Sequence, residues 1–210
     1  MIHPHTQLQY INDIVGYGVF ATQLIPKGTV IYVQDSLDLE IFPDEYETHS
    51  AEMKTHIEKY SYINERGVRI VSWDFAKYVN HCCHSNTMST AYGFDIALQD
   101  IQKGEELTCD YGMLNVEKDM ELVCQKIDCR SILKPTDFET CHRAWDEKIR
   151  AALPYYLEVE QPLESLILPQ NLAALQEYLV RDKRYQSILK LKRNKTIVIL
   201  PKRHGEFSKN

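Results

Sequence analysis

The chain has 210 residues, of which 44% are hydrophobic and 26% charged, so its length suits one substantial domain with or without a small appendage. No uninterrupted apolar run approaches the ~20 residues that a membrane-spanning helix needs, so we expect no membrane association. The first seven residues lack the charged and apolar regions of a secretory signal. We therefore expect a cytoplasmic protein whose six cysteines are free thiols or metal ligands, although secretion by a route without such a signal stays open.

The formal net charge of −6 is unevenly distributed along the chain. Residues 183–210 contain nine Lys or Arg and one acidic residue, a segment charge of about +8, which leaves about −14 for residues 1–182. An acidic body suits a basic partner such as a lysine-rich peptide, but the same charge also serves solubility alone. The basic segment has few aromatic residues and no recognisable nucleic-acid-binding motif, so we do not expect a nucleic-acid partner. Nothing in the sequence indicates the oligomeric state.

The first half of the chain reads as short strands joined by turns. Glycines interrupt an apolar run over residues 15–22, and Pro26-Lys27-Gly28 predicts a turn before a strand of β-branched and aromatic residues at 29–33. A first helix is predicted from Glu45 to Lys59. The other elements predicted here are a hairpin of strands 60–63 and 68–71 around the turn 64–67, a strand at 94–98 and a turn at 102–105.

Helical patterns replace these strands after about Lys134. The segment Thr136-Asp137-Phe138-Glu139 resembles a capping box, and the helix that it starts is predicted to end at Pro154. Leucines at helical spacing predict a second helix from Gln170 to Leu189, and residues 196–200 read as a final strand. A strand-rich front and a helix-rich back therefore meet near residues 113–136.

Two segments carry residue types suited to chemistry. They are Lys77-Tyr78-Val79-Asn80-His81-Cys82-Cys83-His84-Ser85-Asn86 and Gly104-Glu105-Glu106-Leu107-Thr108-Cys109-Asp110-Tyr111-Gly112. Taken alone, the Cys/His cluster lacks the usual spacing of zinc ligands, and the ligands that a zinc-dependent hydrolase needs at helix spacing are absent. Taken alone, the Asp-Tyr pair of the second segment is equally typical of an exposed turn.

Together, in this order and at this spacing, the two segments resemble the SET-domain family of protein lysine methyltransferases. The segments 16–21 and 24–29 resemble the first strands of that family, and the resemblance runs continuously over about residues 9–112. It implies an α+β fold with a mostly β core, in which small curved sheets surround a pseudoknot and a C-terminal helical extension follows. The organisation implied is a SET domain at 1–112, a post-SET-like segment at 113–135 and a helical extension with a basic tail at 136–210.

The resemblance implies methyl transfer from S-adenosylmethionine to the side-chain amine of a lysine in a protein substrate, a histone-like protein being one candidate. A basic protein or peptide is therefore the expected partner. The catalytic residue implied is Tyr111. The alternative is a catalytically inactive SET-like protein-binding module, which substitutions within the family motifs leave open. The residues implied to bind the cofactor are Gly16, Tyr17, Gly18, Asn80 and His81.

Methyl transfer to lysine needs a neutral amine, whereas free lysine has a pKa near 10.4. A narrow aromatic channel disfavours the ammonium by desolvation, and its rings can orient the cation beforehand. For each ring considered singly, ordinary core packing is an equally good explanation. The residues expected to line the channel are Tyr60, Tyr62, Tyr92, Phe94 and Cys109.

The chain departs from the family pattern at several positions. Cys109 stands where many members have Phe or Tyr, and we infer from its small size a roomy channel that permits more than one methylation. Lys77 replaces the usual Arg and Ser85 the usual Pro, and neither change removes a group that contacts the cofactor.

A third candidate site resembles the zinc-binding post-SET motif. Its cysteines are Cys83, Cys124 and Cys129, but Leu122 stands where the family has a further cysteine, so both a zinc site and a metal-free remnant stay open. Without zinc, the predicted helix that carries Trp145 would cover the lysine channel, or it would simply pack on the domain. Acidic residues at 35–47 lie where the family reads substrate, and a solvated face explains them equally well.

Overall fold

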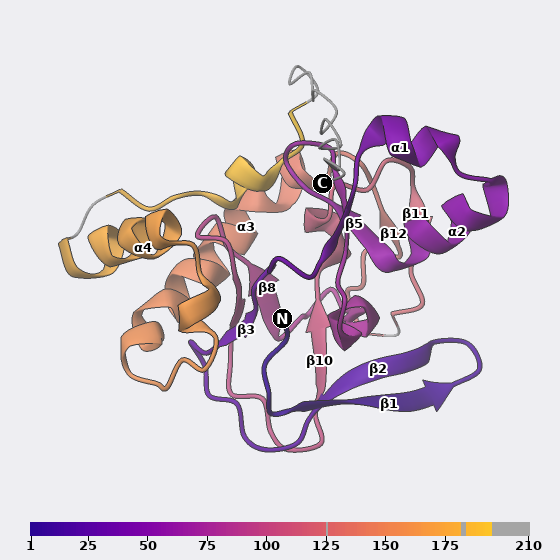
Figure 1. The fold of residues 1–210 in the computed structure, drawn as a ribbon. Helices are drawn as coiled ribbons and strands as arrows, with labels where there is room; N and C mark the ends of the chain where they lie inside the picture. The colour runs from indigo at the N-terminus through magenta and orange to yellow at the C-terminus, as the bar shows by residue number, and fades with distance from the viewer. Residues whose placement is uncertain (125, 182–183, 195–210) are drawn as a thin grey trace, which may run out of the picture.

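The computed structural model describes residues 1–124, 126–181 and 184–194, whose arrangement is drawn in Figure 1. The α-helices are α1 (Pro43–Thr48), α2 (Ala51–Tyr60), α3 (Asp137–Ala152) and α4 (Pro169–Arg181). No described helix combines the length and the apolar character that crossing a bilayer requires. The strands are β1 (Thr6–Asn12), β2 (Gly16–Ala21), β3 (Val30–Tyr32), β4 (Leu39–Ile41), β5 (Ser61–Ile63), β6 (Arg69–Val71), β7 (Asn80–His81), β8 (Thr87–Ser89), β9 (Asp95–Ala97), β10 (Glu106–Cys109), β11 (Met120–Glu121) and β12 (Ile132–Leu133).

The strands form small sheets rather than one large one. Their orders are β1-β2-β10-β7, β3-β9-β8, β4-β6-β5 and β11-β12. Helices α3 and α4 follow in the second half of the chain and lie together on one side of the molecule, as Figure 1 shows. The predicted class, an α+β fold with a mostly β core and a C-terminal helical extension, is therefore confirmed.

The predicted hairpin near residue 65 is confirmed, and its turn explains the residues found there. β5 pairs antiparallel with β6, and the Asn64 side chain accepts hydrogen bonds from the backbone N–H groups of Arg66 and Val68, each at 3.0 Å. Gly67 has a φ of +81°, a left-handed conformation that glycine adopts without steric cost.

The prediction of one helix over residues 45–59 is wrong in one respect, because two helices, α1 and α2, occupy this segment. The chain is extended at His49, and the Ser50 hydroxyl then accepts a hydrogen bond from the Met53 N–H at 3.2 Å, which caps α2. A serine side chain at this position satisfies one of the free N–H groups at a helix start. The local capping bond therefore interrupts what reads as one helix by spacing alone.

Three predictions for the back half need correction or fall outside the structure. Helix α3 begins where predicted, but Thr136 makes no side-chain capping bond, and its carbonyl instead accepts from the Glu139 N–H at 3.1 Å. Helix α4 is described only to Arg181. A separate 3-10 turn follows at Ile188–Leu191, where the Ser187 hydroxyl accepts a capping hydrogen bond from the Leu189 N–H at 3.2 Å. The strand predicted at 196–200 lies outside the described residues.

The helical extension shares its main hydrophobic core with the strands. Val30, Met88 and Ile96 stand opposite one another on β3, β8 and β9 and are fully buried. They belong to one apolar cluster with residues of α3 and α4, including Ile149 and Leu175. The extension therefore covers one face of the β3-β9-β8 sheet and leaves the other face directed toward the rest of the β structure.

Candidate active site

Strand β10 brings the three sequence motifs into one sheet. It pairs antiparallel with the glycine-containing strand β2, where Leu107 lies opposite Val19. On its other side it pairs parallel with β7, so that Thr108 lies opposite Asn80 and Cys109 opposite His81. The Asn-His and Asp-Tyr segments, about thirty positions apart in the sequence, thus become neighbours. This is the arrangement expected of the pseudoknot that the family resemblance implies.

Tyr111 follows directly after this junction and is fixed by contacts with the Asn-His segment. Its backbone N–H donates to His81 Nδ1 at 3.1 Å, and its phenol donates to the Val79 carbonyl at 2.7 Å. Burial is the main cause that lowers the pKa of His81, while the neighbouring Asp110 opposes that shift. A neutral imidazole leaves Nδ1 free to accept this hydrogen bond. Burial raises the pKa of Tyr111 well above its usual range, so the phenol stays protonated.

Asp110 is a buried carboxylate that ties the Tyr111 turn to the C-terminal half. One of its oxygens accepts from the Gly112 N–H at 3.0 Å and from the Arg130 guanidinium, which also pairs with Asp137 at 3.0 Å. The other oxygen accepts from the indole N–H of Trp145 at 3.0 Å. Trp145 therefore packs in the core and bonds to Asp110, which agrees with the packing alternative for α3. Arg130 was missed from the sequence, because a lone arginine in an irregular segment carries no periodic signal.

Gly18 and Asn80 meet at the end of the site expected to hold the cofactor. The Asn80 amide donates to the Tyr17 carbonyl at 3.0 Å and to a Glu106 carboxylate oxygen at 2.8 Å. A Cβ built on Gly18 would lie 2.5 Å from that Glu106 oxygen and 2.7 Å from the Ile11 side chain. Only glycine fits there without displacing a neighbour. Gly16 has a φ of +81° at the start of the same strand, which also suits glycine.

A row of tyrosines runs across the surface next to these residues. The Tyr17 ring, 47% exposed, contacts those of Tyr10 and Tyr78 edge to face, with centroids 5.6 and 6.0 Å apart. Tyr78 in turn contacts Tyr60 at 5.4 Å. The structure therefore brings Tyr17 and Tyr60 together through Tyr78, a residue that sequence reasoning did not select although it stands only two positions before Asn80.

Apart from Tyr60, which lies in that row, the residues predicted to line the lysine channel divide into two groups. Cys109 lies opposite His81 at the junction that leads to Tyr111. Tyr62 lies on β5, opposite Ile70, and its hydroxyl donates to the Gln34 side chain at 3.3 Å. Tyr92 and Phe94 are instead buried against the extension, where their rings contact Tyr178 at 6.3 Å and Tyr156 at 5.9 Å, respectively.

Strand alternation gives the physical reason for this difference. Successive side chains of a strand point to opposite faces, so residues two positions apart point to the same face. Phe94 therefore points the same way as Ile96, which faces the helical extension. The prediction that Tyr92 and Phe94 line the channel is therefore replaced by the packing alternative. Asp95, between Phe94 and Ile96, faces the other way.

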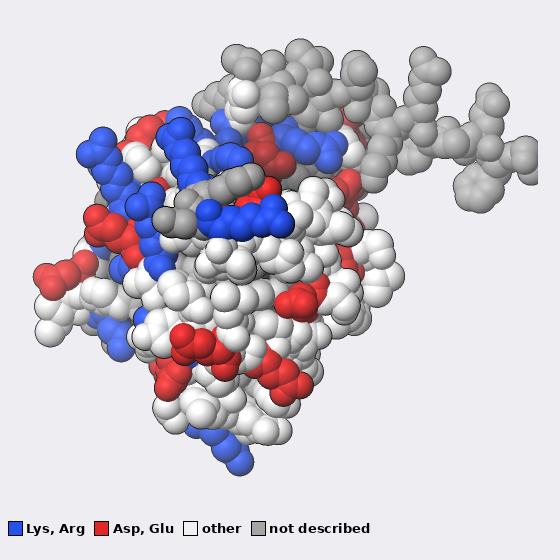
Figure 2. All heavy atoms as spheres, turned by 90° about the vertical axis from the view of Figure 1, so that its left-hand side faces the viewer, with Lys and Arg blue, Asp and Glu red and all other residues white. Residues whose placement is uncertain are grey.

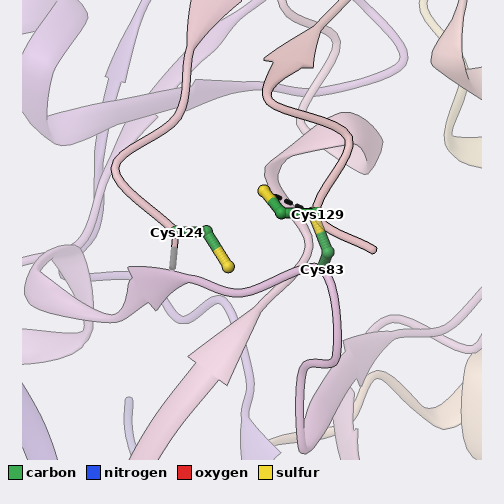
Figure 3. A group of neighbouring side chains, drawn as sticks. All are labelled: Cys83, Cys124 and Cys129. Atoms are coloured by element: carbon green, nitrogen blue, oxygen red, sulfur yellow. Dashed lines mark hydrogen bonds between the residues drawn. The ribbon is translucent and has the colours of Figure 1, made fainter. Parts of the chain in front are cut away.

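Three thiols gather beside the junction of β7 and β10, as Figure 3 shows. The sulfur atoms of Cys83, Cys124 and Cys129 all lie within 4.8 Å of one another, with Cys83 and Cys129 at 3.6 Å. Thiolates around tetrahedral zinc stand about 3.8 Å apart at the usual Zn–S length, so this spacing fits the ion. Two further donors lie close by: His81 Nε2 is 3.3 Å from the Cys83 sulfur, and the Cys82 thiol contacts that of Cys124.

The sequence matches a known protein family. A family model described as SET domain matches residues 16–112, the span from the first glycine motif to the Asp-Tyr motif. The chain contains a SET domain. The sequence resemblance to that family is thereby confirmed.

Named relatives agree with this assignment. Histone-lysine N-methyltransferase Set2 of Drosophila melanogaster is 29% identical over 130 residues, which cover 55% of this chain and 5% of that protein. Variant-silencing SET domain-containing protein of Plasmodium falciparum (isolate 3D7) is 30% identical over 132 residues, covering 54% of this chain and 5% of that protein. The match thus spans only a small part of each relative's length.

A similar solved structure is the methyltransferase domain of human Histone-lysine N-methyltransferase SETMAR. It is 18% identical, with a TM-score of 0.42, and the match covers 63% of this chain and 58% of that one.

Proposed function

We propose that this protein transfers a methyl group from S-adenosylmethionine to the side-chain amine of a lysine in a protein substrate. The observation that carries the proposal is the position of Tyr111, whose backbone and phenol are both hydrogen-bonded to the His81 region at the junction of β7 and β10. We also propose residues 1–112 as the catalytic unit, 113–135 as a post-SET-like segment and 136–210 as its helical extension.

The residues around the junction suit the roles that this reaction requires. S-adenosylmethionine, when bound, supplies a methyl group on a positively charged sulfur. The backbone around Gly18 and the side chain of Asn80 would hold the cofactor, and the close packing of Glu106 and Ile11 against Gly18 leaves no room there for a side chain. Tyr111 would orient the lysine amine, while burial around Tyr62 and Cys109 would exclude water and disfavour the ammonium.

A zinc ion held by Cys83, Cys124 and Cys129 is part of the proposal. The spacing of the three sulfur atoms supports it, and Cys82 or His81 would supply the fourth ligand that Leu122 does not. Zinc there would join the segment 124–130 to β7 and so brace the turn that holds Tyr111. Metal analysis of the purified protein is the test, and a preparation with less than about 0.1 zinc per chain after zinc-supplemented expression would contradict it.

A basic protein substrate fits the acidic net charge of residues 1–182, about −14. Lys192 and Arg193, in the basic C-terminal segment, form ion pairs with Glu139 and Glu117, so part of that positive charge is used within the fold. Figure 2 shows that Lys and Arg side chains gather toward one end of the face that carries α4. Within the acidic stretch, Asp38 is buried and accepts hydrogen bonds from Tyr32 and from the Trp73 N–H, which assigns it a structural role.

The direct test uses radiolabelled S-adenosylmethionine and a panel of basic proteins that includes core histones. We expect label on lysine with the wild-type protein and a loss of at least 100-fold in rate with Tyr111→Phe. Tyr155→Phe is the matched control, because Tyr155 is 41% exposed on the extension and should keep full activity. Equal rates for the wild type and Tyr111→Phe would refute the proposed role of Tyr111.

The alternative is an inactive module that binds proteins through the same fold. The retention of Asn80, His81 and Tyr111, the residue types that the proposed reaction uses, argues against it. Calorimetry separates the two: the proposed enzyme binds S-adenosylmethionine with 1:1 stoichiometry, and an inactive module that has lost the site does not.

A further inference from the structure

His81 contacts two parts of the molecule at once through the two nitrogens of its ring. On one side, Nδ1 accepts a hydrogen bond from the backbone N–H of Tyr111 at 3.1 Å. On the other side, Nε2 lies 3.3 Å from the sulfur of Cys83. Cys83 belongs to the thiol cluster, which consists of Cys83, Cys124 and Cys129. The His81 side chain is only 7% exposed, so protein atoms rather than bulk water surround both nitrogens.

These two contacts fix the position of the proton on the ring. A backbone N–H only donates, so the nitrogen that faces Tyr111 must accept and carries no proton. A neutral imidazole keeps one N–H group, which is then on Nε2 and donates to the Cys83 sulfur. Both the opposite tautomer and the imidazolium would set a ring N–H against the N–H of Tyr111. The contact with Tyr111 therefore selects one form of the ring.

The sulfur of Cys83 is a good acceptor for this N–H group when the thiol cluster carries thiolates. A thiol accepts hydrogen bonds weakly, whereas an ionised acceptor forms shorter and stronger ones. A second N–H group, from Ser131, donates to the sulfur of Cys129 at 3.3 Å, and the sulfurs of Cys83 and Cys129 are 3.6 Å apart. N–H donors thus reach the cluster from two sides, which suits zinc-bound thiolates.

The same tautomer removes His81 from the candidate zinc ligands. A histidine binds zinc through an unprotonated nitrogen, and the N–H of its other ring nitrogen donates to an acceptor. At His81 that other nitrogen faces a donor instead, so Nε2 carries the proton and is not available to the metal. Of the two fourth ligands considered above, Cys82 therefore remains.

The ring of His81 is also one of the groups that hold Tyr111 in place. Tyr111 begins a 3-10 turn, and the first N–H groups of a helical turn have no partner within it. The Asp110 side chain accepts from the N–H of Gly112 at 3.0 Å, and His81 accepts from the N–H of Tyr111. The Val79 carbonyl accepts from the phenol at 2.7 Å. His81 therefore fixes the backbone of Tyr111, while Val79 fixes its phenol.

We propose that His81 is a positioning residue that couples the thiol cluster to the Tyr111 turn, by donating to Cys83 and accepting from Tyr111. The inference rests on the proposed function and adds to it a link between the zinc site and the catalytic residue. When Cys83 is a thiolate, the hydrogen bond from Nε2 is charge-assisted and holds the ring in the orientation that Tyr111 needs. Loss of that negative charge weakens the bond, so the Tyr111 backbone is held less firmly.

The first experiment determines the tautomer of His81 without any methyl transfer. Long-range proton–nitrogen correlation spectra of the wild-type protein distinguish the two ring nitrogens, and the signals missing from His81→Asn identify the residue. We expect the proton on Nε2, both in the protein as purified and after addition of zinc. A proton on Nδ1 would overturn the inference, because Tyr111 could not then donate to the ring.

The second experiment separates the two hydrogen bonds with a pair of variants. In His81→Asn the side-chain carbonyl can replace Nδ1, and in His81→Gln the amide N–H can replace Nε2. We expect His81→Asn to keep the slow exchange of the Tyr111 amide hydrogen but to lose zinc to a chelator at least tenfold faster. We expect the reverse from His81→Gln, with exchange of that amide at least tenfold faster. His84→Gln, an exposed position in the same loop, is the matched control and should change neither rate.

Two results of this comparison would overturn the inference. Equal loss of zinc from both His81 variants would identify the ring as a ligand, and unchanged exchange of the Tyr111 amide in His81→Gln would exclude the positioning role. In methyl transfer to core histones, His81→Gln should lower kcat at least tenfold with a smaller change in KM for S-adenosylmethionine, and an unchanged kcat would also exclude that role. A wild-type protein that transfers no methyl group would count against the proposed function instead, while the tautomer and the amide exchange would still decide the role of His81.

Discussion

Replacing Trp145 by Phe removes one hydrogen bond from a buried carboxylate and leaves the aromatic packing largely in place. The Trp145 ring is 2% exposed, and its N–H lies 3.0 Å from Asp110, which is itself 4% exposed. A hydrogen bond to a charged group contributes about 1.5–3 kcal/mol, and the small cavity left by the missing part of the indole adds about 1 kcal/mol. We therefore expect Trp145→Phe to lower the free energy of unfolding by about 3 kcal/mol.

The control is a tryptophan with the same bond in a different environment. Trp73 also donates its indole N–H to a carboxylate, Asp35, at 3.1 Å, but its side chain is 46% exposed. Water replaces the lost donor there, so Trp73→Phe should cost less than about 0.5 kcal/mol.

Urea unfolding of both variants, followed by circular dichroism, measures the difference. Because Asp110 caps the turn that begins with Tyr111, we also expect Trp145→Phe to reduce kcat with little change in the affinity for S-adenosylmethionine. Equal stability of Trp145→Phe and Trp73→Phe would refute the reasoning that the extension holds the catalytic turn through Asp110.

Three other predictions concern the site itself. Gly18→Ala places a Cβ 2.5 Å from Glu106, so we expect at least tenfold weaker binding of S-adenosylmethionine by calorimetry, and unchanged binding would contradict the cofactor assignment. Cys109→Tyr fills the space next to the amine, and mass spectrometry should show a shift from multiple methylation toward one methyl group; strict monomethylation by the wild type would exclude the roomy channel. Asp95 has a folded-state pKa of about 6, raised above its usual value, so its ionisation destabilises the fold as pH rises. Asp95→Asn should therefore be more stable than the wild type by about 1–3 kcal/mol above pH 6, and the difference should vanish below pH 4, as urea unfolding at several pH values would reveal.

The sequence was sufficient for the family, because its motifs depend on local chemistry. Glycines at 16 and 18, the Asn80-His81 pair and Asp110-Tyr111 each carry a residue type that few other side chains can replace. Their order and spacing do not depend on how the rest of the chain packs. The hairpin at 61–71 and helix α3 were predictable for a similar reason, since turn residues and helical spacing are local signals.

The tertiary structure decided which side chains share a space. Tyr92 and Phe94 were expected to line the channel, but strand alternation turns Phe94 toward the extension and leaves Asp95 on the opposite face, with Tyr32 and Ser89. Trp145 and Arg130 meet Asp110 only because α3 and the segment before it fold back onto the Tyr111 turn. These contacts join residues 20 to 35 positions apart, so local sequence signals could not predict them. Which face each side chain of a short strand points to is fixed by the pairing of that strand with its neighbours, so it could not be predicted from the sequence alone either.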